Sequence, residues 1–90
     1  MPSSFDPRKD AANLRKHGIS LTEGDGVLND PLALTIEDVS AQGEQRFISI
    51  GMNVFGRVRV VAYALRGDDA RIISVRKAGP KEIRDYEEGV

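Results

Sequence analysis

Two runs of alternating character, residues 57–66 and 70–78, limit the possible folds most strongly because they are separated by little more than Gly67 and Asp68. A period of two is typical of half-buried β-strands, and a Gly-Asp pair favours a two-residue hairpin turn. Residues 32–36 and 44–52 have the same period, with polar turns predicted at 38–43 and 53–56. We therefore expect a four-stranded antiparallel meander sheet.

Helix signals precede and follow these strands. Asp6 is a suitable N-cap for a helix that starts at Pro7 and ends near Gly18, a residue that readily adopts the left-handed conformation. Residues 20–23 (SLTE) match a capping box for a second helix that ends at 29–31. A short C-terminal helix is predicted at 81–88, after Gly79 and Pro80. The expected fold is α+β, with two N-terminal helices, the sheet, the C-terminal helix, and the helices on one side of the sheet.

Length and charge limit the class of protein. Ninety residues without cysteine predict one domain, 1–90, with no disulfide. No apolar run could span a membrane and no signal peptide is visible, so we expect a cytoplasmic protein. The net charge of −1 argues against a strongly basic nucleic-acid binder. The charges are nevertheless segregated, because residues 20–44 carry six acidic and no basic side chains, whereas residues 45–81 carry eight basic and two acidic ones.

Strand register predicts where these basic residues gather. A four-residue turn at 53–56 pairs Ile50 with Arg59, and the two-residue turn at 67–68 places Arg59 opposite Arg76. An odd-length turn would instead bring Arg71 and Lys77 beside Arg59. With the even turns, one face carries apolar residues for helix packing, namely Val58, Val60, Ala62, Ala64, Ile73 and Val75. The other face collects Glu44, Arg46, Arg57, Arg59, Tyr63, Ser74 and Arg76, interleaved with Ile48, Ile50, Val61, Leu65 and Ile72.

The residues of this open face predict that it binds an anion and is covered by a partner. Like charges directly across a ladder destabilise it, and the apolar residues between them would form an exposed patch unless something covers them. Other interpretations stay open at this point: the arginines can be solvated or paired with carboxylates such as Glu44, and His17 can simply end its helix. With one histidine and no cysteine, no metal site is predicted.

The order of motifs resembles the BrnT family of type II toxins. The resemblance runs from Phe5 to Glu87 and is carried by the segments FDPRK, KHGIS, EQRFISIG, GRVRVV and RIISVRKA. It implies a RelE-like fold and an endoribonuclease that needs neither metal nor cofactor. It also implies neutralisation by a BrnA-like antitoxin, which contacts operator DNA through its ribbon–helix–helix segment, and a heterotetramer of two toxins with two antitoxins.

Metal-free RNA cleavage requires a base for the 2′-hydroxyl, cations for the pentavalent phosphorane and an acid for the leaving oxygen. Arginine suits the second task because its planar fork matches phosphate oxygens. The catalytic residues expected are Lys16, Glu44, Arg57, Arg59 and Arg76, with Glu44 as a base whose pKa burial would raise. The substrate-binding residues expected are His17, Arg46, Tyr63 and Ser74. The alternative is a non-catalytic module or co-repressor that docks a DNA-binding partner; DNA binding by the chain alone is the weakest reading.

Overall fold

The computed structural model describes residues 2–40 and 42–89. In those residues, three helices and five strands follow one another as β1 (Ser3–Ser4), α1 (Pro7–His17), α2 (Glu23–Leu28), β2 (Leu34–Glu37), β3 (Arg46–Met52), β4 (Val58–Arg66), β5 (Asp69–Lys77) and α3 (Pro80–Glu88). The α+β class and the antiparallel meander of β2 to β5 agree with the prediction. The strand count does not, because β1 adds a parallel edge strand beside β5. Two residues are too few for an alternating pattern to reveal a strand.

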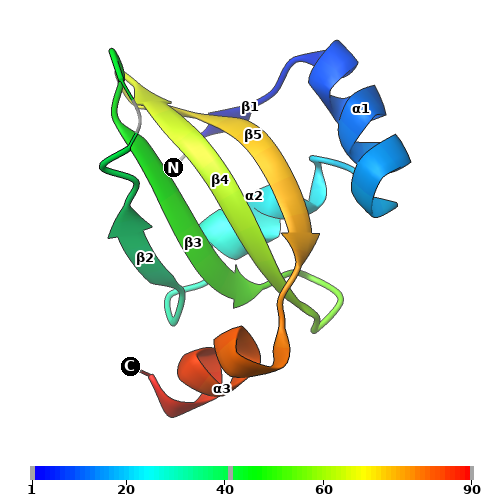
Figure 1. The fold of residues 1–90 in the computed structure, drawn as a ribbon, viewed down its shortest axis with the longest axis vertical. Coiled ribbons are helices and arrows are strands. Elements are labelled where there is room, and N and C mark those ends of the chain that lie inside the picture. The colour runs from blue at the N-terminus through cyan, green and yellow to red at the C-terminus, as the bar shows by residue number, and fades with distance from the viewer. Residues whose placement is uncertain (1, 41, 90) are drawn as a thin grey trace.

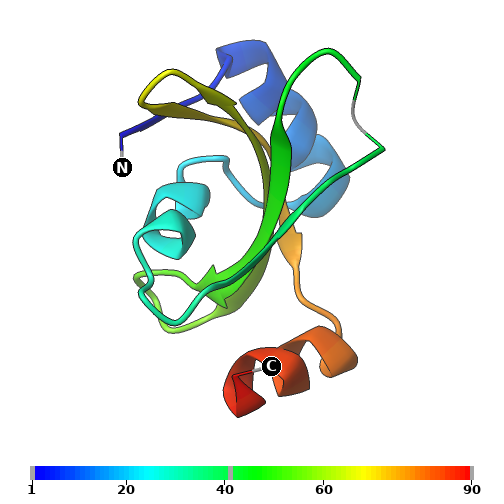
Figure 2. The same ribbon diagram turned by 90° about the vertical axis from the view of Figure 1, so that its left-hand side faces the viewer.

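The helices do not share one side of the sheet, contrary to expectation. Figures 1 and 2 show α2 covering one face, α1 lying beside β5, and α3 lying at the end of the sheet toward the opposite face. The core forms between α2 and the strands and contains Ile19, Leu21, Val27, Val61, Tyr63, Ala70, Ile72 and Val75. A Cβ added at Gly24 would lie 3.0 Å from Ile72 Cδ1, so α2 packs tightly on the sheet because that position lacks a side chain.

The register between β3 and β4 differs from the predicted one by one residue. Ile50 pairs with Val60 and Met52 with Val58, so the predicted pair Ile50–Arg59 is wrong. The other pairs that a four-residue turn implies are wrong for the same reason, namely Met52–Arg57, Ile48–Val61 and Arg46–Tyr63. The connecting loop contains five residues, 53–57, because Asn53 closes it: its Oδ1 accepts from the backbone N–H groups of Phe55 (2.9 Å) and Arg57 (3.0 Å). One extra loop residue moves each side chain of β4 to the face opposite the predicted one.

The turn between β4 and β5 has the predicted two residues, since Arg66 pairs with Asp69. A register shift between Ala62 and Tyr63 then places Lys77, and not Arg76, opposite Arg59. Arg59 consequently shares the α2-covered face with Val61, Tyr63, Leu65 and Ile72. The predicted helix-packing residues Val58, Val60, Ala62 and Ala64 belong to the opposite face, which we call the outer face; it carries Arg76.

The helix ends follow local rules with one exception. Asp6 caps α1 by accepting from Arg8 N at 2.8 Å, and Gly18 ends that helix at φ 71°, both as predicted. The capping box at residues 20–23 does not form, because Ser20 Oγ donates to Asp10 and the Glu23 carboxylate is paired with Arg59 instead. None of the helices in the described residues is long and apolar enough to cross a membrane.

Candidate functional site

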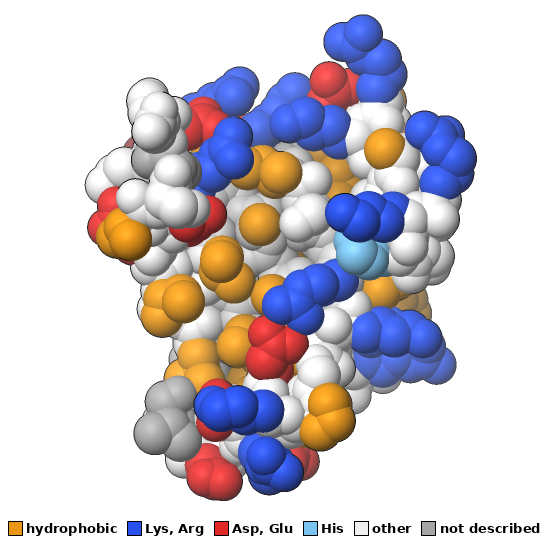
Figure 3. Space-filling view, viewed as in Figure 1, with side chains coloured by type: hydrophobic (Ala, Val, Ile, Leu, Met, Phe, Trp, Pro, Cys, Tyr) orange, Lys and Arg blue, Asp and Glu red, His pale blue; other side chains and the backbone are white. Residues whose placement is uncertain are grey.

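A groove of about 510 Å³ between α1 and β5 gathers four of the predicted site residues. Its walls are Lys9, Ala12, Asn13, Lys16 and His17 from α1, and Ile73, Ser74 and Arg76 from β5. The α1 residues are spaced three or four positions apart, which places them on one face of the helix. Figure 3 shows His17, the only histidine of the sequence, among Lys and Arg side chains that continue along this border of the molecule.

Asn13 attaches α1 to β5. Its side-chain amide donates to the carbonyl oxygens of Val75 and Ile19, each at 2.8 Å, and its oxygen accepts from Val75 N at 3.3 Å. The amide thus exchanges two hydrogen bonds with Val75, as a neighbouring strand would, at a part of the β5 edge that β1 does not reach. With Asn13 only 6% exposed, this connection sets the position of the whole helix relative to the sheet.

Lys16 and His17 reach the groove because α1 ends beside it. The Gly18 N–H donates to Leu14 O at 2.9 Å, which closes the last turn. Two cationic or ionisable side chains in that turn lie at the negative end of the helix dipole, where positive charge is favoured. The chain beyond the turn is held by Asp10, whose Oδ1 accepts from Leu21 N at 2.7 Å.

Arg76 lies at the end of β5 with its side chain 45% exposed. It forms a bidentate ion pair with Glu82 of α3, with Nη1 and Nη2 each donating to one carboxylate oxygen at 2.9 Å. The hydrogen bond from Arg76 is the main reason that the pKa of Glu82 falls below its ordinary value, so Glu82 is a carboxylate at neutral pH. The same bond raises the pKa of Arg76.

Arg59 and Tyr63 are buried and do not line the α1–β5 groove. Each is only 6% exposed on the face covered by α2. Arg59 Nε donates to Glu23 Oε1 at 3.1 Å, and Asn53 donates to the same oxygen at 2.7 Å. Tyr63 stacks on Phe47 with ring centroids 5.7 Å apart. Arg59 thus connects α2 and the loop 53–57 to the sheet, whereas Tyr63 belongs to the core. The predicted placement of both residues on the open face is wrong.

Glu44 and Arg46 form a separate cluster. Glu44 accepts from Arg46 Nε at 2.9 Å and lies 3.6 Å from Arg66 Nη2. The hydrogen bond from Arg46 is the main cause that lowers the pKa of Glu44, whereas the predicted role as a base depended on a raised one. Neither residue lines the α1–β5 groove.

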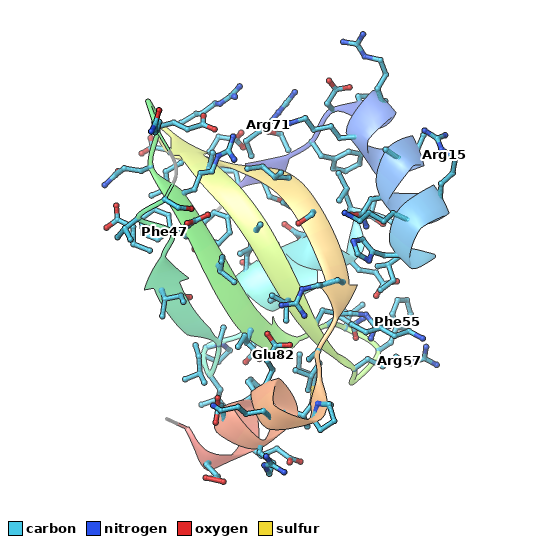
Figure 4. The ribbon with its side chains drawn as sticks, viewed as in Figure 1. Arg15, Phe47, Phe55, Arg57, Arg71 and Glu82 are labelled. Atoms are coloured by element: carbon cyan, nitrogen blue, oxygen red, sulfur yellow. The ribbon has the colours of Figure 1, made fainter. Side chains whose placement is uncertain are left out.

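Arg57 projects from the loop 53–57 and is exposed. Figure 4 shows it pointing away from the sheet, while Glu82 lies at the start of α3 and Arg71 near the other end of the sheet. Sequence reasoning missed Lys9, Asn13 and Glu82. The first two share the helical spacing of Lys16 and His17, a signal that was available, whereas Glu82 is identified only by its contact with Arg76.

Among residues 2–40 and 42–89, no group of three or more His, Cys, Asp or Glu side chains is arranged to hold a metal ion. The groove is instead lined by cations and polar groups that can bind an anion and transfer protons. Such a set fits a phosphate group.

Comparisons with known proteins identify the family and the fold. A family model described as the ribonuclease toxin BrnT of type II toxin–antitoxin systems matches residues 5–82. The crystal structure of the Brucella abortus ribonuclease toxin BrnT is similar in fold, with a TM-score of 0.67 and 20% sequence identity. The match covers 88% of this chain and 99% of that one. None of the curated proteins compared with the chain matches it.

Proposed function

The chain belongs to the BrnT family of ribonuclease toxins of type II toxin–antitoxin systems, and on this basis we propose that it is a metal-independent endoribonuclease acting in the α1–β5 groove. Cleavage of RNA in the cytoplasm would inhibit translation and growth. The observation that carries the proposal is the convergence of Lys16, His17, Ser74 and Arg76 on one groove. The α+β meander supports a RelE-like classification of the fold.

Arg76 is the residue that binds the scissile phosphate. Attack of the 2′-hydroxyl on phosphorus places negative charge on the non-bridging oxygens, and a fixed guanidinium stabilises that charge without transferring a proton. Lys16, together with Lys9, adds positive charge to the same groove. Ser74, two residues before Arg76 in β5, offers a hydroxyl that can donate to a phosphate oxygen.

His17 is the residue of the groove suited to proton transfer. Imidazole is the side chain whose ordinary pKa lies nearest neutral pH, so it can take the proton of the 2′-hydroxyl or return one to the 5′ oxygen. Lys16 can supply the second proton-transfer group from the same helical turn. Arg57, exposed outside the groove, is suited to contact the backbone of a longer RNA.

A second function is favoured by one observation, the apolar surface of the outer face. Leu34, Ile36, Ile48 and Ile50 line a cavity of about 300 Å³, and Ile36 is 65% exposed. Such a surface suits a protein partner. A BrnA-like antitoxin that binds operator DNA and forms a heterotetramer with the toxin is the partner that the family implies, and in a non-catalytic module this surface alone would carry the function.

RNA cleavage by the purified chain in EDTA tests the enzyme. Wild type should cut single-stranded RNA, and Arg76→Ala should lower the rate by about 10²–10³-fold, as loss of one charge-stabilising donor does in other enzymes. Lys16→Ala should also slow cleavage. Arg15→Ala is the matched control, because Arg15 directly precedes Lys16 in α1 but does not line the groove (Figure 4).

Two results would contradict the proposal: no cleavage by folded wild type, or equal cleavage by Arg76→Ala. Expression without the antitoxin separates the two functions. Growth arrest that Arg76→Ala abolishes supports the enzyme, whereas growth that is unaffected by wild type supports the docking module.

A further inference from the structure

Glu82 contacts Arg76 in a way that leaves two of the five guanidinium N–H donors without an acceptor. The two Nη atoms point at the Glu82 carboxylate, and Nη1 also donates to Lys77 O at 3.2 Å. In the described residues, no acceptor is bonded to Nε or to the second hydrogen of Nη2. Those two donors form the side edge of the guanidinium, which can hold two oxygens of one phosphate.

The carboxylate is itself held in place. Gly79 N donates to Glu82 Oε1 at 2.9 Å, and Ile83 N donates to Gly79 O at 2.9 Å, which closes the first turn of α3. The other end of α3 is attached to the rest of the protein through Tyr86, whose hydroxyl donates to Asp30 Oδ2 at 2.5 Å. The Glu82 carboxylate is held by Gly79 N, and α3 as a whole is held by Tyr86. The carboxylate therefore restricts the movement of the Arg76 guanidinium that it binds.

From this geometry we propose that Glu82 is a positioning residue: it grips the Nη end of Arg76 so that the Nε–Nη2 edge is presented to an RNA phosphate in the α1–β5 groove. The inference rests on the proposed ribonuclease function. Arg76 is exposed enough to adopt many rotamers on its own, and restricting it before substrate arrives removes an entropic cost from the reaction. The competing explanation is that Glu82 occupies the phosphate position and must be displaced.

Glu82→Gln separates these explanations by kinetics. The amide keeps the shape of the side chain but presents an N–H₂ group to one of the Nη donors, so the grip is lost. If Glu82 positions Arg76, kcat should fall by about tenfold or more while KM changes by less than about threefold. If Glu82 competes with the phosphate, its removal should lower KM and leave kcat unchanged or higher, which would overturn the proposal.

Asp85→Asn is the matched control. Asp85 lies one turn further along α3 and pairs with Lys81 at 2.9 Å, so its loss weakens the same helix without touching Arg76. Its kcat should equal that of wild type. Equal losses of kcat and melting temperature in both variants would show a merely structural role. In an Arg76→Lys background, which has no Nη fork, Glu82→Gln should cause no further loss of kcat.

Nuclear magnetic resonance of the Arg76 side chain tests the geometry without catalysis. Titration of wild type with uncleavable 2′-O-methyl RNA should shift the resonances of Nε–H and of the Nη2 proton on the same edge. The Nη protons that donate to Glu82 should stay in place, and Glu82→Gln should abolish this selectivity. Movement of the Nη resonances alone would mean that RNA displaces Glu82, against the proposal. If wild type fails to cleave RNA, the proposed function is refuted, whereas the edge that binds phosphate is still decided by these resonances.

Discussion

Replacement of Asn13 by alanine tests whether one buried side chain holds α1 against the sheet. The change removes three hydrogen bonds, two to carbonyl oxygens at 2.8 Å and one from Val75 N at 3.3 Å. At about 1 kcal/mol net for each bond, the free energy of unfolding should fall by about 3 kcal/mol. A chain of this length has a total of roughly 5–13 kcal/mol, so the loss is a large part of its stability.

Urea unfolding followed by circular dichroism measures this loss. With a slope of about 1.5 kcal/mol per M, the midpoint should move down by about 2 M while the slope stays constant. Asn29→Ala is the control, because the Asn29 amide donates to Asp25 O at 3.0 Å but is exposed, and its loss should cost no more than about 0.5 kcal/mol. A midpoint shift below about 0.5 M for Asn13→Ala would refute the reasoning.

Asn13→Asp adds a pH-dependent form of the same test. The ionised side chain accepts from Val75 N but places an oxygen against two carbonyl oxygens, so the pKa of the introduced carboxyl should rise on folding. A raised folded pKa means that protonation favours the native state. The destabilisation should therefore be largest at pH 7 and should decrease as the pH falls toward about 4. Equal destabilisation at both pH values would contradict this account.

Three further outcomes are expected. Arg59→Ala removes the cation that pairs with Glu23 of α2. The free energy of unfolding should therefore fall by about 2–3 kcal/mol and the melting temperature by about 10 °C or more. Glu44→Gln should keep cleavage within about twofold, because the lowered pKa leaves Glu44 a poor base; a tenfold loss would reinstate it. Desolvation alone would raise the pKa of Asp30, but hydrogen bonds, one of them from Tyr86, lower it overall. The ionised Asp30 therefore stabilises the fold above the ordinary value of 3.8, and this contribution is lost as the pH falls through the lower folded pKa. Tyr86→Phe should therefore cost about 1 kcal/mol at pH 7 and less in acid, as thermal melting at both pH values would reveal.

The local elements were predictable because their signals are local. Asp6 and Gly18 mark the ends of α1, and the two-residue turn after Arg66 joins β4 to β5, as expected. Capping and turn geometry depend on a few adjacent residues whose backbone preferences are strong. The segregation of basic residues into 45–81 was likewise visible without a structure.

The face assignment was the main error, and it came from two single-residue effects. Asn53 closes a five-residue loop in place of four, and the shift between Ala62 and Tyr63 separates Arg59 from Arg76. Because strand side chains alternate strictly, one residue of register moves every later side chain to the other face. The register thereby separates Arg59, buried in an ion pair with Glu23, from Arg76, which lines the α1–β5 groove.

By itself, the sequence determined the ends of α1, the turn between β4 and β5 and the residue types capable of binding phosphate. The first two follow from backbone geometry within a few residues. Only the tertiary structure decided which of those residues meet. Asn13 bonds to Val75 across 62 positions, and Glu82 reaches Arg76 only because α3 turns back under the sheet. Contacts of this kind depend on register and packing, where alternatives differ by little free energy and no local pattern distinguishes them.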